Sequence, residues 1–107
     1  MSPESLDALV AAGTAPAILD VRSRREFVRG RVPGAEHLPF WQTPWRLPLL
    51  PVNRTDTVVV YCAYGPRAWM AGLVLAARGY RGVTYLDGHY ARWQRQGRPR
   101  ERVSADG

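Results

Sequence analysis

The only cysteine of the chain, Cys62, stands where a reactive thiol is expected. It follows the apolar run 57–60, which predicts a buried strand, and precedes a helical run from Arg67 to Arg78. A strand that leads through a tight turn into a helix presents backbone N–H groups and the positive end of the helix dipole to its last residues. Both features favour a thiolate and a bound anion. We therefore interpret Cys62 as a nucleophile and residues 63–68 as an anion-binding loop.

The alternative is that Cys62 is a small buried apolar residue, as a lone cysteine usually is. Its position argues against this. The carboxyl end of a strand is where open α/β sheets bind their ligands. Gly65 permits a sharp turn, and Arg67 supplies a permanent cation. This combination favours a functional thiol.

The pattern Cys62-x-x-Gly65-x-Arg67-Ala68 resembles the active-site loop of the rhodanese family of sulfurtransferases. The resemblance extends over nearly the whole chain, from about Leu6 to Gly97. Residues 19–22, 26–27 and 30–35 resemble the amino-terminal signature of the family, and residues 85–88 with Trp93 resemble its final part. Three features depart from the family pattern: Arg31 replaces a usual His, His89 replaces a common second Gly, and the chain starts directly with a helix.

The resemblance implies sulfur transfer through Cys62. The thiolate would attack the outer sulfur of an anionic donor such as thiosulfate, release sulfite and carry a persulfide until a thiol or cyanide removes the sulfur. The residues that would bind the donor are Ala63, Tyr64, Gly65, Pro66, Arg67 and Ala68. Asp20 and Arg22 would support the site. The resemblance implies no metal and no organic cofactor.

Two other functions fit parts of the pattern. The domain could be a sulfur carrier or partner-binding module with little activity on free thiosulfate, which docks on a protein sulfur donor or acceptor. Alternatively, phosphatases and arsenate reductases related to the rhodanese fold place five residues between Cys and Arg. Here four residues separate Cys62 from Arg67, so the loop is smaller and better suited to a sulfur atom than to a tetrahedral phosphate.

Composition narrows the classes of function. The 107 residues suffice for one domain with a single core. The net charge is +6 and all fifteen basic residues are arginine, which favours anionic substrates or acidic partners. The arginines are spread along the chain, so we expect no primary role in nucleic-acid binding. A single cysteine excludes an internal disulfide and a four-cysteine metal site.

The expected cellular location is the cytoplasm, because a free reactive thiol suits a reducing compartment. No apolar run approaches the length of a membrane span, and no signal peptide is visible, so we expect no membrane association. With no second cysteine in the chain, a persulfide on Cys62 must be discharged by an external acceptor.

The order of elements predicts an α/β domain of rhodanese type, with a small parallel sheet of about four to five strands and helices on both faces. We assign residues 1–97 to this domain and residues 98–107 to a basic, solvated tail. Helices are expected from Ser2 to Gly13, from Ser23 to Gly30, over 67–78 and from Asp87 to Gly97; strands are expected over 17–20, 36–39, 57–61 and 83–86.

Three local expectations bear on the site. Arg22 and Glu26 are expected to form an ion pair. His37 is interpreted as a structural histidine with satisfied hydrogen bonds, since nothing pairs with it in sequence. The apolar, proline-rich segment 40–52 permits only a short helix. One interpretation is a packed crossover that covers the sheet. The other is a functional surface, either the wall of a pocket or a docking site for a partner. The sequence does not decide between them.

Overall fold

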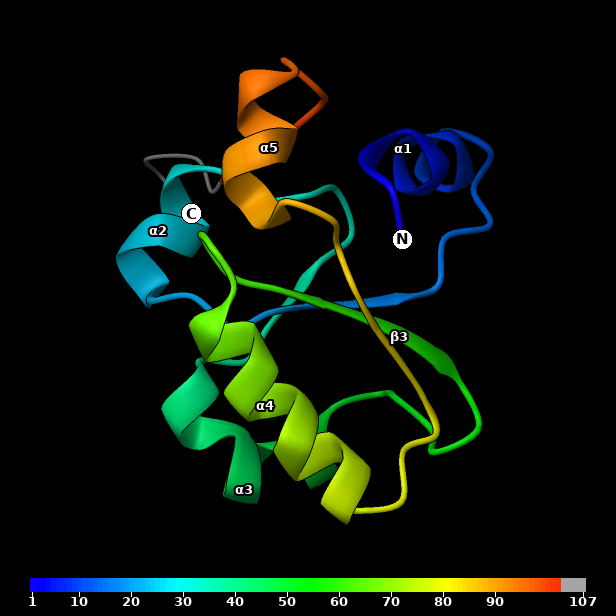
Figure 1. Ribbon diagram of the computed structural model, residues 1–107, viewed down its shortest axis with the longest axis vertical. Helices are drawn as coiled ribbons and strands as arrows, with labels where there is room; N and C mark the ends of the chain where they lie inside the picture. The colour runs from blue at the N-terminus through cyan, green and yellow to red at the C-terminus, as the bar shows by residue number, and fades with distance from the viewer. Residues whose placement is uncertain (103–107) are drawn as a thin grey trace.

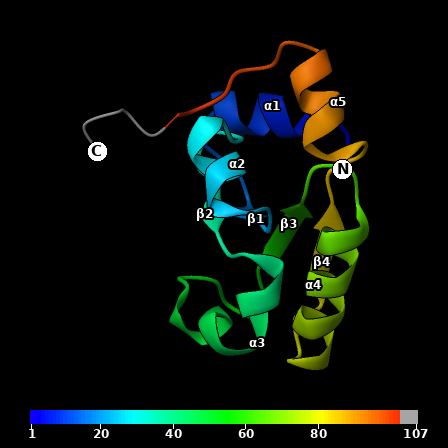
Figure 2. The same cartoon turned by 90° about the vertical axis from the view of Figure 1, so that its left-hand side faces the viewer.

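The four strands form one parallel sheet, which a computed structural model describes for residues 1–102. The order across the sheet is β2-β1-β3-β4 (Figure 2). The central strands β1 and β3 carry the continuous apolar runs typical of parallel strands that are covered on both faces. The predicted α/β class with a four-stranded parallel sheet is thus confirmed. The strands are β1 (Ala17–Asp20), β2 (Glu36–His37), β3 (Thr57–Tyr61) and β4 (Gly82–Tyr85).

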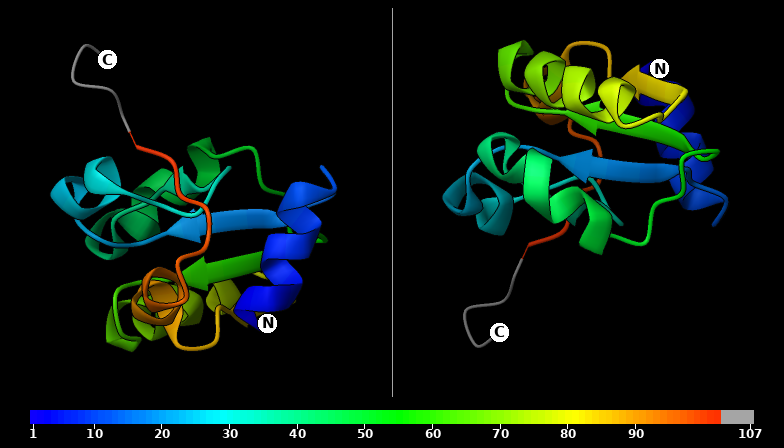
Figure 3. Two further views of the ribbon diagram at one scale, coloured as in Figure 1. Left: turned by 90° about the horizontal axis from the view of Figure 1, so that it is seen from above. Right: turned by 90° about the horizontal axis from the view of Figure 1, so that it is seen from below.

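Helices cover both faces of the sheet (Figures 1 and 3). On one face lie α1 (Pro3–Ala11) and α5 (His89–Arg95), and on the other lies α4 (Pro66–Ala77) with the crossover that precedes β3. The short helix α2 (Arg24–Arg29) follows β1. The expected helix starts at Ser2 and Ser23 are confirmed, because each serine side chain caps its helix by accepting a hydrogen bond from the backbone N–H three residues later. No helix within residues 1–102 is long and apolar enough to cross a membrane.

The core consists of two layers because successive strand residues point to opposite faces. Ile18, Val59 and Tyr61 pack under α1 and α5, where Leu6 and Trp93 are fully buried. The alternate strand residues Leu19, Val58 and Val60 pack under α4 and the crossover. Cys62 belongs to this second layer, at the carboxyl end of β3.

The crossover 40–52 is a run of short turns, as its prolines predict: a 3-10 turn (Phe40–Gln42), α3 (Thr43–Arg46) and a second 3-10 turn (Leu47–Leu49). Leu47 and Thr43 are buried against the sheet layer, so the segment is a packed crossover. Its outer side is nevertheless apolar. Large apolar side chains of the crossover and of the neighbouring α4 are more than half exposed: Trp41, Trp45, Leu49, Trp69, Met70 and Leu73. A docking role for this surface remains a prediction.

Residues 99–102 of the predicted solvated tail are exposed, but the segment 98–102 is held against the rest of the chain by specific contacts. Arg98 makes ion pairs with Glu4 and Asp7 of α1. Trp93 Nε1 donates to the carbonyl of Pro99, and Glu101 exchanges backbone hydrogen bonds with Arg31. These contacts tie the segment to α1, to α5 and to the stretch that follows α2. Residues 103–107 lie outside the described residues, and the division at residue 97 stays a prediction.

Gly82 allows β4 to approach β3 closely. A Cβ built at this position would lie 2.5 Å from the backbone oxygen of Asp56 and 3.1 Å from Thr57 Cα. Because both neighbours are backbone atoms, they cannot move without a shift of the strand pair. We expect Gly82→Ala to lower the free energy of unfolding by about 1–3 kcal/mol, measured by urea denaturation. Thr84→Ala in the same strand is the control, and an equal loss in both variants would contradict the steric explanation.

Candidate active site

The thiol of Cys62 is held inside the turn between β3 and α4. Cys62 is 1% exposed, and its Sγ accepts a hydrogen bond from the backbone N–H of Gly65, with an N···S distance of 2.9 Å. Gly65 has a φ of 137°, a conformation that side chains rarely adopt. The glycine therefore closes the turn so that its own amide faces the sulfur. The predicted arrangement of strand, tight turn and helix is confirmed, although α4 begins at Pro66, one residue earlier than expected.

The first residues of α5 hold the turn from the other side. The N–H of Tyr90 donates to the carbonyl of Cys62 at 3.0 Å, and the N–H of Ala91 donates to the carbonyl of Ala63 at 3.1 Å. These donors belong to the first turn of a helix, where backbone N–H groups have no partner within the helix. The carbonyl groups of Cys62 and Ala63 thus point toward α5, where backbone N–H groups satisfy their hydrogen-bonding capacity.

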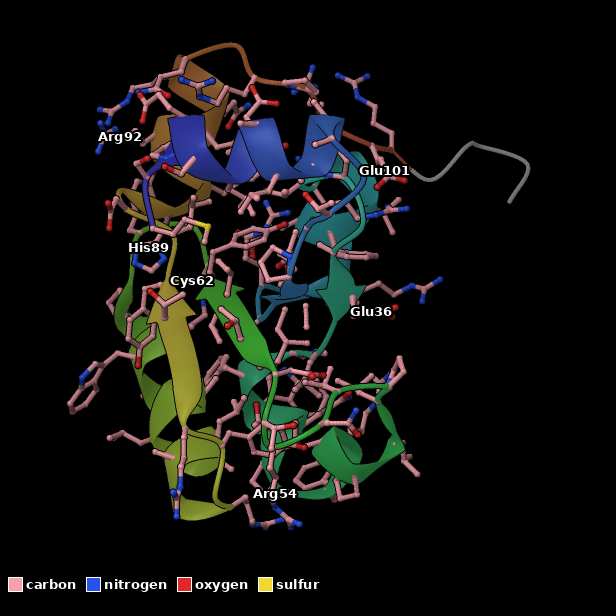
Figure 4. The ribbon with its side chains drawn as sticks, turned by 90° about the vertical axis from the view of Figure 1, so that its right-hand side faces the viewer. Glu36, Arg54, Cys62, His89, Arg92 and Glu101 are labelled. Carbon is pink, nitrogen blue, oxygen red and sulfur yellow. The ribbon has the colours of Figure 1, made fainter. Side chains whose placement is uncertain are left out.

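His89 is a site residue that sequence reasoning missed. Figure 4 shows its ring beside Cys62, and Nδ1 accepts the Cys62 N–H at 3.3 Å. Burial lowers the pKa of His89, which favours the neutral ring that this hydrogen bond requires. His89 also has a φ of 53°, in the left-handed region. The only sequence signal was that a histidine stands where the family commonly has glycine, a residue that adopts this conformation without strain.

Asp20 and Arg22 form a buried ion pair at the edge where Cys62 lies. Asp20 is 0% exposed and Arg22 is 4% exposed. Arg22 Nη2 lies 2.6 Å from Asp20 Oδ2, and Arg22 Nε and backbone N also donate to the carboxylate. Burial acts to lower the pKa of Arg22, but the hydrogen bond and charge of Asp20 more than offset this and raise it. The pair contacts neighbouring elements and makes no hydrogen bond to Cys62.

The predicted ion pair between Arg22 and Glu26 is wrong. Glu26 instead binds Arg67 with both carboxylate oxygens, at 2.8 Å from Nη1 and 3.2 Å from Nη2. Glu26 also accepts hydrogen bonds from Ser23, with which it forms a capping box at the start of α2. The guanidinium of Arg67 is therefore turned toward α2 and connects it to the first turn of α4. The hydrogen bond from Arg67 is the main reason that the pKa of Glu26 falls to about 2.

The other predicted loop residues differ in their exposure. Ala68 is buried beneath the loop, whereas the Tyr64 side chain is 82% exposed. Ala63 and Tyr64 form part of the wall of a cavity of about 490 Å³ that extends from the loop to α2 and α5. The loop therefore contacts both the core and an open cavity.

His37 is structural, as predicted. Its ring stacks on Phe27 with a centroid distance of 4.4 Å, and Nε2 lies 2.9 Å from the carbonyl oxygen of Arg22. Within residues 1–102, no three His, Cys, Asp or Glu side chains gather in a way that could hold a metal ion.

Comparison with known proteins places this fold and loop in a family. The family model described as Rhodanese-like domain matches residues 2–96. A sulfurtransferase of Allochromatium vinosum is 34% identical over 96 residues, which cover 90% of this chain and 88% of that protein. The human thiosulfate:glutathione sulfurtransferase is 29% identical, with 87% and 90% covered. The crystal structure of the Alr3790 protein from Anabaena has the same fold, with a TM-score of 0.84, 24% identity and coverage of 99% and 95%.

The chain belongs to the rhodanese-like family. The family match and the curated relatives support a rhodanese-type sulfurtransferase, in agreement with the resemblance drawn from the loop.

The buried charge of Asp20 gives the first prediction about the site. Asp20→Asn leaves the guanidinium of Arg22 buried without a counter-charge, so we expect a loss of about 3–5 kcal/mol in the free energy of unfolding. Asp7→Asn removes a partly exposed partner of Arg98 and should cost less than about 1 kcal/mol. Both can be measured by urea denaturation followed by tryptophan fluorescence. Similar losses in the two variants would contradict a special role for the buried pair.

The ion pair between Glu26 and Arg67 predicts a pH dependence. Because the folded protein holds the Glu26 carboxyl at a pKa of about 2, below its ordinary value of 4.5, the unfolded chain takes up the proton first as the pH falls. The stabilisation is thus complete above pH 4.5 and is lost toward pH 2. We expect Glu26→Gln to remove about 1 kcal/mol of this acid-sensitive stability, after allowance for partial solvent exposure.

The control for this pH dependence is Glu36→Gln, which changes an exposed glutamate at the edge strand β2. The free energy of unfolding of each variant should be compared with the wild type at pH 7 and pH 3. We expect the difference in free energy of unfolding between the wild type and Glu26→Gln to be smaller at pH 3 than at pH 7. The same difference at both pH values would show that the ion pair does not act as described.

Proposed function

We propose that the protein is a single-cysteine sulfurtransferase that accepts a sulfane sulfur from an anionic donor such as thiosulfate. The Cys62 thiolate attacks the outer sulfur of the donor, the sulfur–sulfur bond of thiosulfate breaks, and sulfite leaves with the bonding electron pair. Cys62 then carries a persulfide. The observation that carries the proposal is the position of Cys62 Sγ, which accepts the Gly65 amide inside the turn that begins α4.

Unused amide groups of the loop support binding of an anion. Within residues 1–102, the backbone N–H groups of Ala63, Tyr64, Arg67 and Ala68 donate to no protein acceptor. Pro66 has no N–H, as the sequence predicts. Amides that are fixed in place by a turn and a helix can stabilise negative charge without reorganisation. In this proposal they bind first the donor and then the outer sulfur of the persulfide.

Arg67 acts in this proposal mainly by holding the loop. Its guanidinium is engaged by both oxygens of Glu26, so its charge is largely compensated. This arrangement also argues against phosphoryl chemistry, in which an arginine after the loop would have to bind the phosphate oxygens. Asp20 and Arg22 serve as supporting residues, because they fix the strand end without a hydrogen bond to Cys62.

Discharge of the persulfide requires an external acceptor. A thiolate attacks the outer sulfur, the bond to Cys62 Sγ breaks, and Cys62 leaves as a thiolate while the acceptor becomes a persulfide. Cyanide would accept the same sulfur as thiocyanate. The exchange is balanced without a redox partner, and no second cysteine in the chain is needed.

The alternative function is that of a sulfur carrier for a partner protein. The observation that favours it is the exposed apolar surface over the crossover and α4, because exposed indole side chains are common in protein interfaces. A carrier would take sulfur from a protein persulfide and show little activity on free thiosulfate.

Intact mass measurement tests the proposal directly. We expect the wild type to gain the mass of one sulfur atom after exposure to thiosulfate and to lose it on addition of cyanide or a thiol. Cys62→Ser should gain nothing, because it lacks the thiolate. A gain only with a protein persulfide donor would support the carrier function. No sulfur uptake from either donor would refute sulfur transfer through Cys62.

A further inference from the structure

The ring of His89 touches both ends of the turn that holds Cys62. At one end, Nδ1 accepts the Cys62 N–H at 3.3 Å, beside the thiol (Figure 4). At the other end, a Cβ built on Gly65 would lie 3.3 Å from His89 Nε2 and 3.5 Å from Cδ2, so the ring packs against the face of Gly65 that carries no side chain. Gly65 is the residue whose amide donates to Cys62 Sγ. One ring thus contacts both the residue that carries the thiol and the residue that binds it.

The backbone at His89 indicates that this ring has a purpose. His89 has a φ of 53° and follows Gly88, which has a φ of 73°, so two successive residues adopt the left-handed conformation. Glycine adopts this conformation without strain, whereas a residue with a side chain does so rarely. Strained backbone of this kind is concentrated at functional sites. The side chain of His89 therefore contributes something that the glycine common in the family at this position cannot.

The hydrogen bond from Cys62 fixes the protonation state of the ring. Nδ1 can accept the Cys62 N–H only if it carries no proton, so the ring is neutral with its proton on Nε2. In the imidazolium form both ring nitrogens are donors. Protonation would therefore set an N–H of the ring against the N–H of Cys62, and the hydrogen bond would be lost. The contact between His89 and the cysteine loop depends on pH.

The groups around the ring favour its neutral form at pH 7. Burial outweighs the charge of Asp87, which acts to raise the pKa of His89, so that the pKa lies below its ordinary value of 6.5. Asp87 is itself 3.5 Å from the amino group of Met1. Tyr85 of β4 is the neighbouring aromatic ring, with centroids 6.5 Å apart, and Arg92 is the first charged residue along α5. The ring takes up its proton only in mildly acidic solution.

We propose that His89 is a positioning residue for Cys62 and that it acts only in its neutral form. The inference rests on the proposed function, because its consequence is that sulfur transfer slows when the ring is protonated. The neutral ring holds the Cys62 N–H and supports Gly65, so the Gly65 amide stays directed at Sγ. The imidazolium releases the Cys62 N–H, and the loop loses this support. No atom of His89 takes part in the transfer itself.

Two substitutions of His89 separate the hydrogen bond from the titration. His89→Asn is the matched variant: Asn Oδ1 stands at the same place along the side chain as Nδ1, accepts an N–H, tolerates the left-handed backbone and does not titrate. His89→Gly suits the backbone but has no acceptor. Urea denaturation followed by tryptophan fluorescence, at pH 8 and at pH 5, verifies that both variants are folded.

The measurement is the rate at which iodoacetamide, an uncharged reagent, alkylates Cys62 between pH 8 and pH 5. At pH 8 we expect His89→Asn to react within about threefold of the wild type and His89→Gly about tenfold more slowly, as for the loss of one hydrogen bond. The ratio of the wild-type rate to that of His89→Asn should fall about tenfold toward pH 5. Its midpoint should lie below pH 6.5.

Other titrating groups do not account for a fall in this ratio. The Cys62 thiol and His37, the second histidine of the chain, are present in both proteins, so their ionisation cancels. The Glu26 carboxyl has a pKa of about 2, so its ion pair with Arg67 persists over the whole range from pH 8 to pH 5.

Four outcomes would overturn the proposal. One is a ratio that does not change with pH, and another is a His89→Gly variant as fast as the wild type at pH 8. The third is a His89→Asn variant as slow as His89→Gly at pH 8, which would show that the acceptor atom is not what positions the loop. The fourth is a ratio that rises toward pH 5, which would show that the charge of the imidazolium assists the thiolate.

Sulfur uptake, followed by intact mass after exposure to thiosulfate, separates this inference from the proposed function. We expect the rate of uptake to show the same dependence on pH and on the two variants as the rate of alkylation. If the wild type gains sulfur on Cys62 and both ratios are constant, only the role of His89 is refuted. If no sulfur is gained from any donor, the proposed function fails, and the alkylation rates still decide whether neutral His89 positions Cys62.

Discussion

The buried charge of Asp20 is the constraint on which the end of the sheet beside Cys62 depends. A carboxylate without solvent exposure is tolerated only if its oxygens are fully hydrogen-bonded. Asp20 meets this condition through three donors of Arg22 and the hydroxyl of Tyr61 at 2.7 Å. These bonds span β1 and β3. The same network reaches further, because Tyr61 Oη accepts the Val32 N–H and Arg22 donates to the carbonyl of Gly30. Loss of the carboxylate would thus loosen three segments at once: the end of β1, the end of β3 and residues 30–32.

This network positions Cys62 indirectly, since Asp20 itself makes no hydrogen bond to the cysteine. Tyr61 immediately precedes Cys62, so fixing the tyrosine at the strand end also fixes the start of the loop. The Glu26–Arg67 pair fixes the other end of the loop, at the first turn of α4. Between these two anchors, the amides of Tyr90 and Ala91 hold the loop carbonyls. A loop fixed in this way also fixes its own backbone amides, and preorganised amides stabilise charge effectively because they do not have to reorient.

The sequence predicted the parts of the structure that depend on local pattern. The turn around Cys62 was predicted correctly, because the signals for a strand (57–60), a turn (Gly65) and a helix follow one another directly in the sequence. The predicted partner of Arg22 was wrong, and the reason is physical. We paired it with Glu26 by spacing, but Arg22 precedes α2 and its side chain turns back to Asp20 inside the core. Arg67, the true partner of Glu26, is distant in sequence, and no local rule could identify it.

Long-range pairing also explains why the sequence did not reveal the contacts of residues 98–102. An arginine-rich segment with few apolar residues is typical of a solvated tail. In the folded chain, however, Arg98 pairs with Glu4 and Asp7 of α1, and Glu101 exchanges backbone hydrogen bonds with Arg31. This docking matters for the site, because it places Arg100 beside Gly30 at the cavity. Two kinds of arginine thus lie near the loop. Arg22 and Arg67 are paired with Asp20 and Glu26, whereas Arg29, Arg95 and Arg100 around the cavity form no ion pair within residues 1–102.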